Sequence, residues 1–142
     1  MDRIERSHMK LETVLYAVAA AQLAVAVINL FLVRLLGWRS ELERMPLLVR
    51  EVFMVHAWFI SITLAIFGTL TMRFAPEFAA RSHEVFRWLA AGIGAFWALR
   101  TVLQITYYSS SHWKGRLDRT IIHILLLTTY GGLAGAYVAA AL

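Results

Sequence analysis

Four long apolar runs, separated by short charged segments, dominate the sequence. They cover residues 13–36, 48–72, 85–108 and 120–142. A helix needs about 20 mostly apolar residues to cross a bilayer, and each run is long enough. Lipid admits only helices or closed barrels, and these runs are too long and too continuously apolar for barrel strands. We therefore predict an all-α, polytopic integral membrane protein with four transmembrane helices.

The segments between the runs carry most of the charge and both prolines, Pro46 and Pro76. We expect connectors here, because proline lacks the backbone N–H that a helix interior needs. No linker, low-complexity tract or convincing internal repeat interrupts the pattern, which favours a single domain over residues 1–142. Short connectors favour antiparallel neighbours, so we expect an up-down-up-down bundle.

The start of the chain and the distribution of charge bear on orientation. Residues 7–9 read Ser-His-Met, which resembles a cloning remnant before a native start at Met9, so residues 1–8 are given no function. Positive charges are nearly balanced between the two expected sides, so the positive-inside rule does not decide the orientation. Without residues 1–8 the balance favours loops 37–47 and 109–119 in the cytoplasm and both termini outside, and the alternative is a dual topology. We expect a multi-pass protein, most simply of a bacterial inner membrane.

Composition supports the membrane interpretation and removes other classes. Hydrophobic residues make up 60% of the chain and charged residues 16%, against roughly 45–50% and 25% in soluble domains. The 14 Lys and Arg residues sit mostly between the apolar runs, so the net charge of +5 does not indicate a nucleic-acid binder. The chain has no cysteine, which excludes disulfides, iron–sulfur clusters, thiolate zinc sites and a cysteine nucleophile.

Polar side chains within the runs gather in one half of the expected bilayer. We predict that they line a ligand pocket opening at one membrane face, formed by Glu51, His56, Arg100, Gln104, Tyr107 and His123. An ionisable group in hydrocarbon is costly and therefore raises a functional hypothesis. Arg100, Gln104 and Tyr107 recur at helical spacing and share one face. Glu51 lies at a compatible depth, so we predict an ion pair with Arg100; the alternative is that Arg100 snorkels to the headgroups.

The predicted pocket would present a basic residue to an anionic group, and the apolar half of the bundle beneath it would hold a lipophilic body. A quinone, a haem or a lipid would each suit this arrangement. His56 and His123 lie on runs that would be diagonal in the bundle, where they could ligate a b-type haem axially. A non-haem metal bound by His56, His123, His112 and Glu51 is a further hypothesis. The alternative is that each histidine makes an ordinary interhelical hydrogen bond. The sequence does not decide whether the protein is an enzyme.

Small residues on the fourth run suggest a different class of function. Gly131, Gly132 and Gly135 form rows that allow close helix approach. They fit packing within one protomer, a homo-oligomer, or docking into a larger membrane complex as an accessory or scaffold subunit. A transporter is disfavoured, because a conduction path needs polar groups at the midplane and beyond.

Two short segments carry a family resemblance. Residues 100–107, which read RTVLQITY, are similar to the Arg-then-Tyr pattern near the end of the third span of the MAPEG family. Arg50 and Glu51 followed by His56 are similar to a segment on that family's second span. The resemblance implies a four-span, trimeric membrane enzyme that acts on glutathione and a lipophilic substrate. The second Arg and the Asn of that segment are absent, since Met54 and Trp58 stand in their places.

Overall fold

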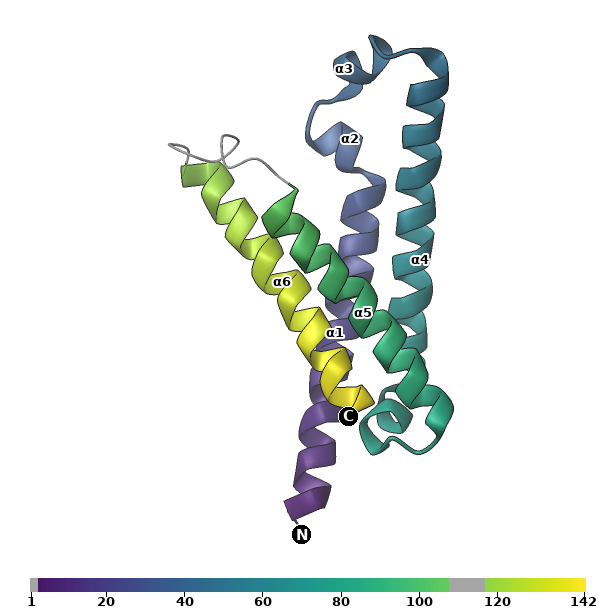
Figure 1. Cartoon of the computed structure of the whole chain (residues 1–142), viewed down its shortest axis with the longest axis vertical. Coiled ribbons are helices and arrows are strands. Elements are labelled where there is room, and N and C mark those ends of the chain that lie inside the picture. Colours follow the sequence, from purple (N-terminus) through teal and green to yellow (C-terminus); the bar gives the residue numbers. More distant parts are fainter. Residues whose placement is uncertain (1–2, 108–116) are drawn as a thin grey trace. The chain divides into compact units, whose positions relative to one another are not determined.

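The structure is a computed structural model that describes residues 3–107 and 117–142 (Figure 1). In these residues all regular elements are α-helices: α1 (Arg3–Leu30), α2 (Leu32–Leu35), α3 (Arg39–Glu43), α4 (Leu47–Ala80), α5 (Glu84–Thr106) and α6 (Leu117–Ala141). Four of them, α1, α4, α5 and α6, contain stretches long and apolar enough to cross a membrane. The all-α class and the four apolar helices are thereby confirmed for the described part of the chain.

The chain divides into two compact units. One unit combines Met1–Val18 with Phe74–Leu142, and the other is Ala19–Arg73. The first contains α5, α6 and the end of α4, and the second contains most of α4 with the last part of α1. The single four-helix domain stays a prediction.

In the unit Ala19–Arg73, α1 and α4 pair as an antiparallel hairpin through amide side chains. The Gln22 amide nitrogen donates to the Leu64 carbonyl at 3.4 Å. About two turns further along α1, the Asn29 amide donates to the Ala57 carbonyl at 3.0 Å and to the Ser61 hydroxyl at 2.9 Å. Later residues of α1 thus contact earlier residues of α4. Apolar helices gain little from association in lipid, so such polar contacts help to define the pairing.

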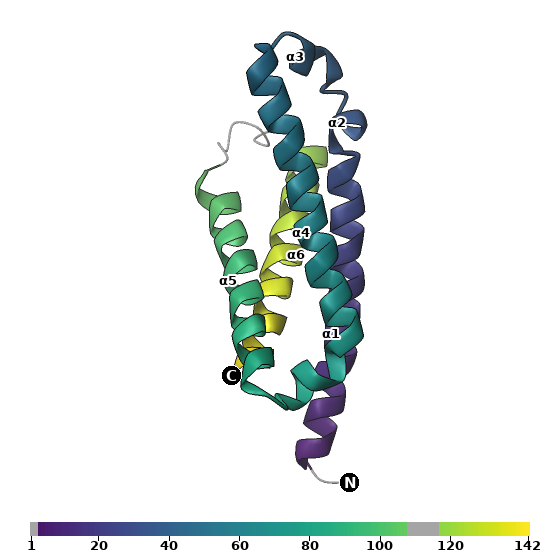
Figure 2. The same cartoon turned by 90° about the vertical axis from the view of Figure 1, so that its right-hand side faces the viewer.

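In the other unit, α5 and α6 run side by side in opposite directions (Figure 2). The buried residues of α5 recur at helical spacing and are Ala90, Ile93, Gly94, Trp97 and Gln104. The buried residues of α6 share one face and are Tyr130, Leu133, Ala134, Tyr137 and Ala140. The backbones approach closely at Gly94, where an added Cβ would lie 3.3 Å from the Tyr137 Cβ.

The end of α4 differs from the expectation based on its proline. Pro76 was expected in a connector, but it lies inside α4, which continues to Ala80. The helix is kinked at Phe74, where φ is −119° and ψ is 24°. Pro76 therefore falls in the first turn after the break, where its missing N–H does not interrupt a regular helix. Only residues 81–83 separate α4 from α5.

Two arginines cap helix ends in this unit. Arg81 adopts φ +50° after α4, and the Ser82 and Arg81 N–H groups donate to the Glu77 and Phe78 carbonyls, which completes a Schellman motif. The Arg81 guanidinium donates to the Ala139 carbonyl at 2.7 Å, near the end of α6. Arg87 similarly donates to the Ala141 carbonyl at 3.1 Å. Both guanidinium groups satisfy carbonyls that a helix C-terminus leaves unpaired.

Candidate functional site

A buried polar contact joins α5 to α6. The Gln104 amide nitrogen lies 3.1 Å from the His123 Nδ1 atom. Gln104 is 4% exposed, and its amide oxygen is buried without a hydrogen-bond partner among the described residues. If the amide N–H donates, His123 carries its proton on Nε2; with the amide reversed, the proton lies on Nδ1. In both cases one end of a buried amide has hydrogen-bonding capacity left over.

An aromatic pair and a cation lie along the same face of the hairpin. Trp97 of α5 stacks on Tyr130 of α6, with ring centroids 5.4 Å apart and 27° between the planes. The Arg100 guanidinium carbon lies 4.8 Å from the centroid of the Tyr130 ring. A cation over an aromatic face is attracted to it, and more strongly away from water. We call Arg100, Gln104 and His123, with this aromatic pair, the α5–α6 polar cluster.

The structure brings together three of the six predicted pocket residues, which are Arg100, Gln104 and His123. Tyr107, at the end of α5, is 81% exposed. Glu51 and His56 lie on α4, in the unit Ala19–Arg73, and both are exposed. The ion pair between Arg100 and Glu51 would join the two units, so it stays a prediction.

The two histidines predicted as metal ligands also belong to different units. His56 Nδ1 lies 2.9 Å from the Val52 carbonyl of its own helix. A carbonyl only accepts, so Nδ1 donates this hydrogen bond and Nε2 is the ring nitrogen left for a metal. In the described part of the chain, no group of three or more His, Asp or Glu residues could bind a metal ion. His112 lies outside that part. The non-haem metal therefore has no structural support, and the haem stays a prediction.

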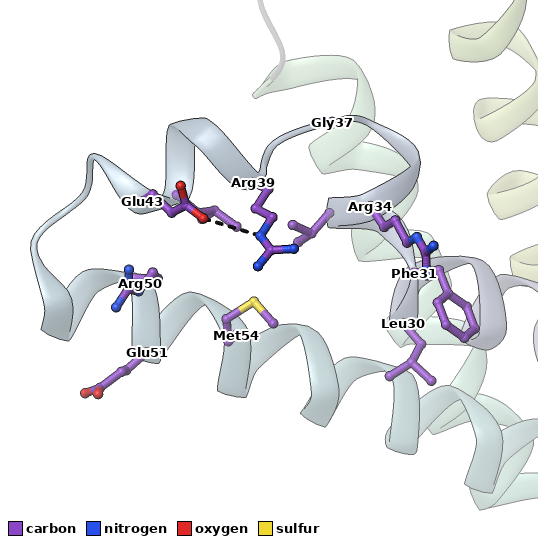
Figure 3. A pocket seen from close by; sticks show the side chains of 11 residues that line it. Leu30, Phe31, Arg34, Gly37, Arg39, Glu43, Arg50, Glu51 and Met54 are labelled. Carbon is purple, nitrogen blue, oxygen red and sulfur yellow. Dashed lines mark hydrogen bonds and ion pairs between the residues drawn. The ribbon is translucent and has the colours of Figure 1, made fainter.

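Sequence reasoning missed a pocket in the unit Ala19–Arg73, between the end of α1, the helices α2 and α3, and the start of α4 (Figure 3). We call it the connector pocket. Its volume is about 850 Å³, and its lining is Leu30, Phe31, Val33, Arg34, Gly37, Arg39, Leu42, Glu43, Arg50, Glu51 and Met54. Of the predicted site residues, Glu51 is the one that lines it.

The connector pocket forms because the first apolar run does not continue as one helix to Leu36. Helix α1 ends at Leu30, and the short α2 follows. The chain then turns at Gly37, whose φ of +66° is a left-handed conformation that favours glycine. Gly37, placed between the basic residues Arg34 and Arg39, was the sequence signal for this turn.

No protein-family model, curated protein or solved structure matches the chain. The resemblance to the MAPEG family therefore rests on the short segments around His56 and Arg100 alone.

Proposed function

We propose that the chain is a multi-pass membrane protein whose α5–α6 polar cluster binds the polar head of a small lipophilic ligand. Four apolar helices support membrane insertion, since only 17% to 28% of the residues in their most apolar stretches are buried in the structure. Exposed apolar surface of this extent is unusual for a soluble monomer. The antiparallel pairing within each hairpin agrees with an up-down-up-down arrangement. Residence in a bacterial inner membrane stays a prediction.

The observation that carries the binding proposal is the buried Gln104 amide oxygen without a partner in the described residues. An unsatisfied buried polar group costs about 1–3 kcal/mol. A ligand group that donates a hydrogen bond to this oxygen would remove that cost. His123 contacts the other end of the amide from α6, so the end of the amide that has no partner among the described residues has a defined position.

The ligand classes that suit the cluster are a quinone, a haem and a lipid. A quinone suits the cluster, since the Gln104 oxygen can accept a hydrogen bond from the hydroxyl of the reduced form. The stacked Trp97 and Tyr130 rings offer an aromatic surface beside these groups. A haem would instead take a ring nitrogen of His123 as an axial ligand.

The ligand class is tested on protein purified in a mild detergent. We would record its optical spectrum and analyse an organic extract of the same sample by mass spectrometry. A Soret band identifies a haem, and a stoichiometric quinone or lipid in the extract identifies the other classes. A colourless protein whose extract contains no stoichiometric small molecule contradicts the proposal.

A scaffold subunit is the second candidate, and a specific observation favours it. An added Cβ at Gly131, Gly132 or Gly135 would meet nothing within 4 Å, so these glycines leave open space along α6. Rows of small residues with such space allow another helix to approach closely. Under this function Gly132→Leu and Gly135→Leu would change the mass of the assembly in native mass spectrometry. Gly92→Leu on α5, which also has open space, is the matched control.

A further inference from the structure

The connector pocket has an apolar wall and a basic rim. Leu30, Phe31, Val33, Leu42 and Met54 form the apolar part of the lining. The pocket begins where the apolar stretch His8–Leu30 ends and where the next one, Leu47–Ala80, starts. In a membrane it would lie at the boundary between hydrocarbon and headgroups, where basic pockets beside spanning helices bind anionic headgroups.

Three arginines line the pocket. The guanidinium groups of Arg34 and Arg50 make no hydrogen bond or ion pair within the described residues. The Arg39 Nε atom forms a 3.3 Å ion pair with Glu43. The two terminal nitrogens of Arg39 have no partner among the described residues. Figure 3 shows the Arg39 side chain reaching from α3 toward Met54 on α4. Several guanidinium donors are thus available to a ligand.

The acidic residues of the lining do not neutralise this basic group. Glu43 and Arg39 are 61% and 88% exposed as side chains, and an exposed ion pair is weak enough for a ligand to displace. Figure 3 shows Glu51 pointing away from α3 and from Arg39. Three cations against two carboxylates leave the pocket positively charged.

A phosphate group matches this set of donors. Guanidinium binds phosphate oxygens through paired, charge-assisted hydrogen bonds, which are stronger than neutral ones. The volume of about 850 Å³ is in the range of pockets that hold a whole small ligand, so a phosphate alone would not fill it. The apolar wall suits the carbon chain to which the phosphate is esterified.

We propose that the connector pocket binds a phosphate ester, with Arg39 holding the phosphate and the positive charges of Arg34 and Arg50 in the same lining attracting it. The ester is either a lipid headgroup from the bilayer or a soluble phosphate ester, since the same chemistry serves both. The inference does not rest on the proposed function, because the connector pocket and the α5–α6 polar cluster lie in different units and share no residue.

The test is native mass spectrometry of the full chain in detergent. Dioleoylphosphatidylglycerol is compared with dioleoylglycerol, which has the same acyl chains and no phosphate. We expect at least about tenfold preferential retention of the phospholipid, and a loss of that order in Arg39→Gln and in the double variant Arg34→Gln/Arg50→Gln. Arg39→Lys should bind at an intermediate level, because it keeps the charge and loses the paired geometry.

The matched control is Arg44→Gln. Arg44 lies on the same connector and pairs with Glu41 at 3.7 Å, but it does not line the pocket. Its substitution should change retention less than about twofold, since it removes only a distant charge that salt screens. Circular dichroism of each variant confirms the helical fold; these arginines are not in the buried core.

A second arm separates the two sources of the ester. If excess glycerol 3-phosphate leaves retention of the phospholipid unchanged, the ligand is a lipid headgroup. If glycerol 3-phosphate itself binds and depends on the same arginines, the ligand is a soluble ester. The proposal is overturned if phospholipid and dioleoylglycerol bind alike, or if Arg44→Gln weakens binding as much as Arg39→Gln does.

Discussion

Gln104 combines a structural contact with an unused hydrogen-bonding group. Replacing it with Leu removes the bond to His123, which contributes about 1 kcal/mol, but also removes the unpartnered oxygen, which costs about as much. We therefore expect Gln104→Leu to change the free energy of unfolding of the ligand-free protein by less than about 1 kcal/mol. This change in the free energy of unfolding is measured by unfolding both proteins in a denaturing detergent while circular dichroism monitors the loss of helix. A much larger loss of stability would show that Gln104 is mainly a structural residue.

Part of the site could be predicted at the scale of residues. Helical spacing places Arg100 and Gln104 on one face of α5, and the structure agrees. Their partners on α6, Tyr130 and His123, could not be derived from spacing, because periodicity defines a face of one helix and not which helix covers it. His123 was identified by its depth in the expected bilayer, and its contact with Gln104 required the structure.

The hairpin of α5 and α6 depends on a close backbone approach at Gly94. A leucine there would drive its side chain into Tyr137 and Val138, whose atoms lie 3.3–3.4 Å from the position of an added Cβ. Overpacking of this kind costs about 1–3 kcal/mol. We expect Gly94→Leu to be less stable than Gly92→Leu by that amount, because Gly92 has open space on the same helix.

This comparison is measured by unfolding both variants in a denaturing detergent. Helix propensity changes equally in the two variants, so their difference reports the packing alone. Equal stability would show that α5 and α6 do not pack closely at Gly94.

At the scale of elements the sequence predicted helix identity better than helix ends. The four apolar runs correspond to α1, α4, α5 and α6, because about 20 continuous apolar residues leave little choice of structure. The expectation that Pro76 lies in a connector was wrong, because the kink at Phe74 lets the helix continue past the proline. The end of the first run was expected at Leu36 because, apart from Arg34, residues 31–36 are as apolar as the helix before them.

Membrane topology is the property of the whole molecule that hairpin pairing predicts. The chain contains no cysteine, so single cysteines can be introduced without a background. In an up-down-up-down arrangement, Ser40→Cys and Ser110→Cys react with a membrane-impermeant maleimide from one side, and Ser82→Cys reacts from the other. Labelling intact and permeabilised vesicles measures this. Reaction of Ser40→Cys and Ser82→Cys from the same side would contradict the proposed topology.

The central claim for the whole molecule is that the α5–α6 polar cluster binds a small lipophilic ligand. The most direct measurement is native mass spectrometry of the wild type beside His123→Ala and Gln104→Leu, with His83→Ala as control. His83 is exposed and precedes α5, so its loss should leave the ligand in place. We predict a stoichiometric small-molecule adduct in the wild type and in His83→Ala, and its loss in both cluster variants. An adduct that persists in His123→Ala and Gln104→Leu would contradict the account.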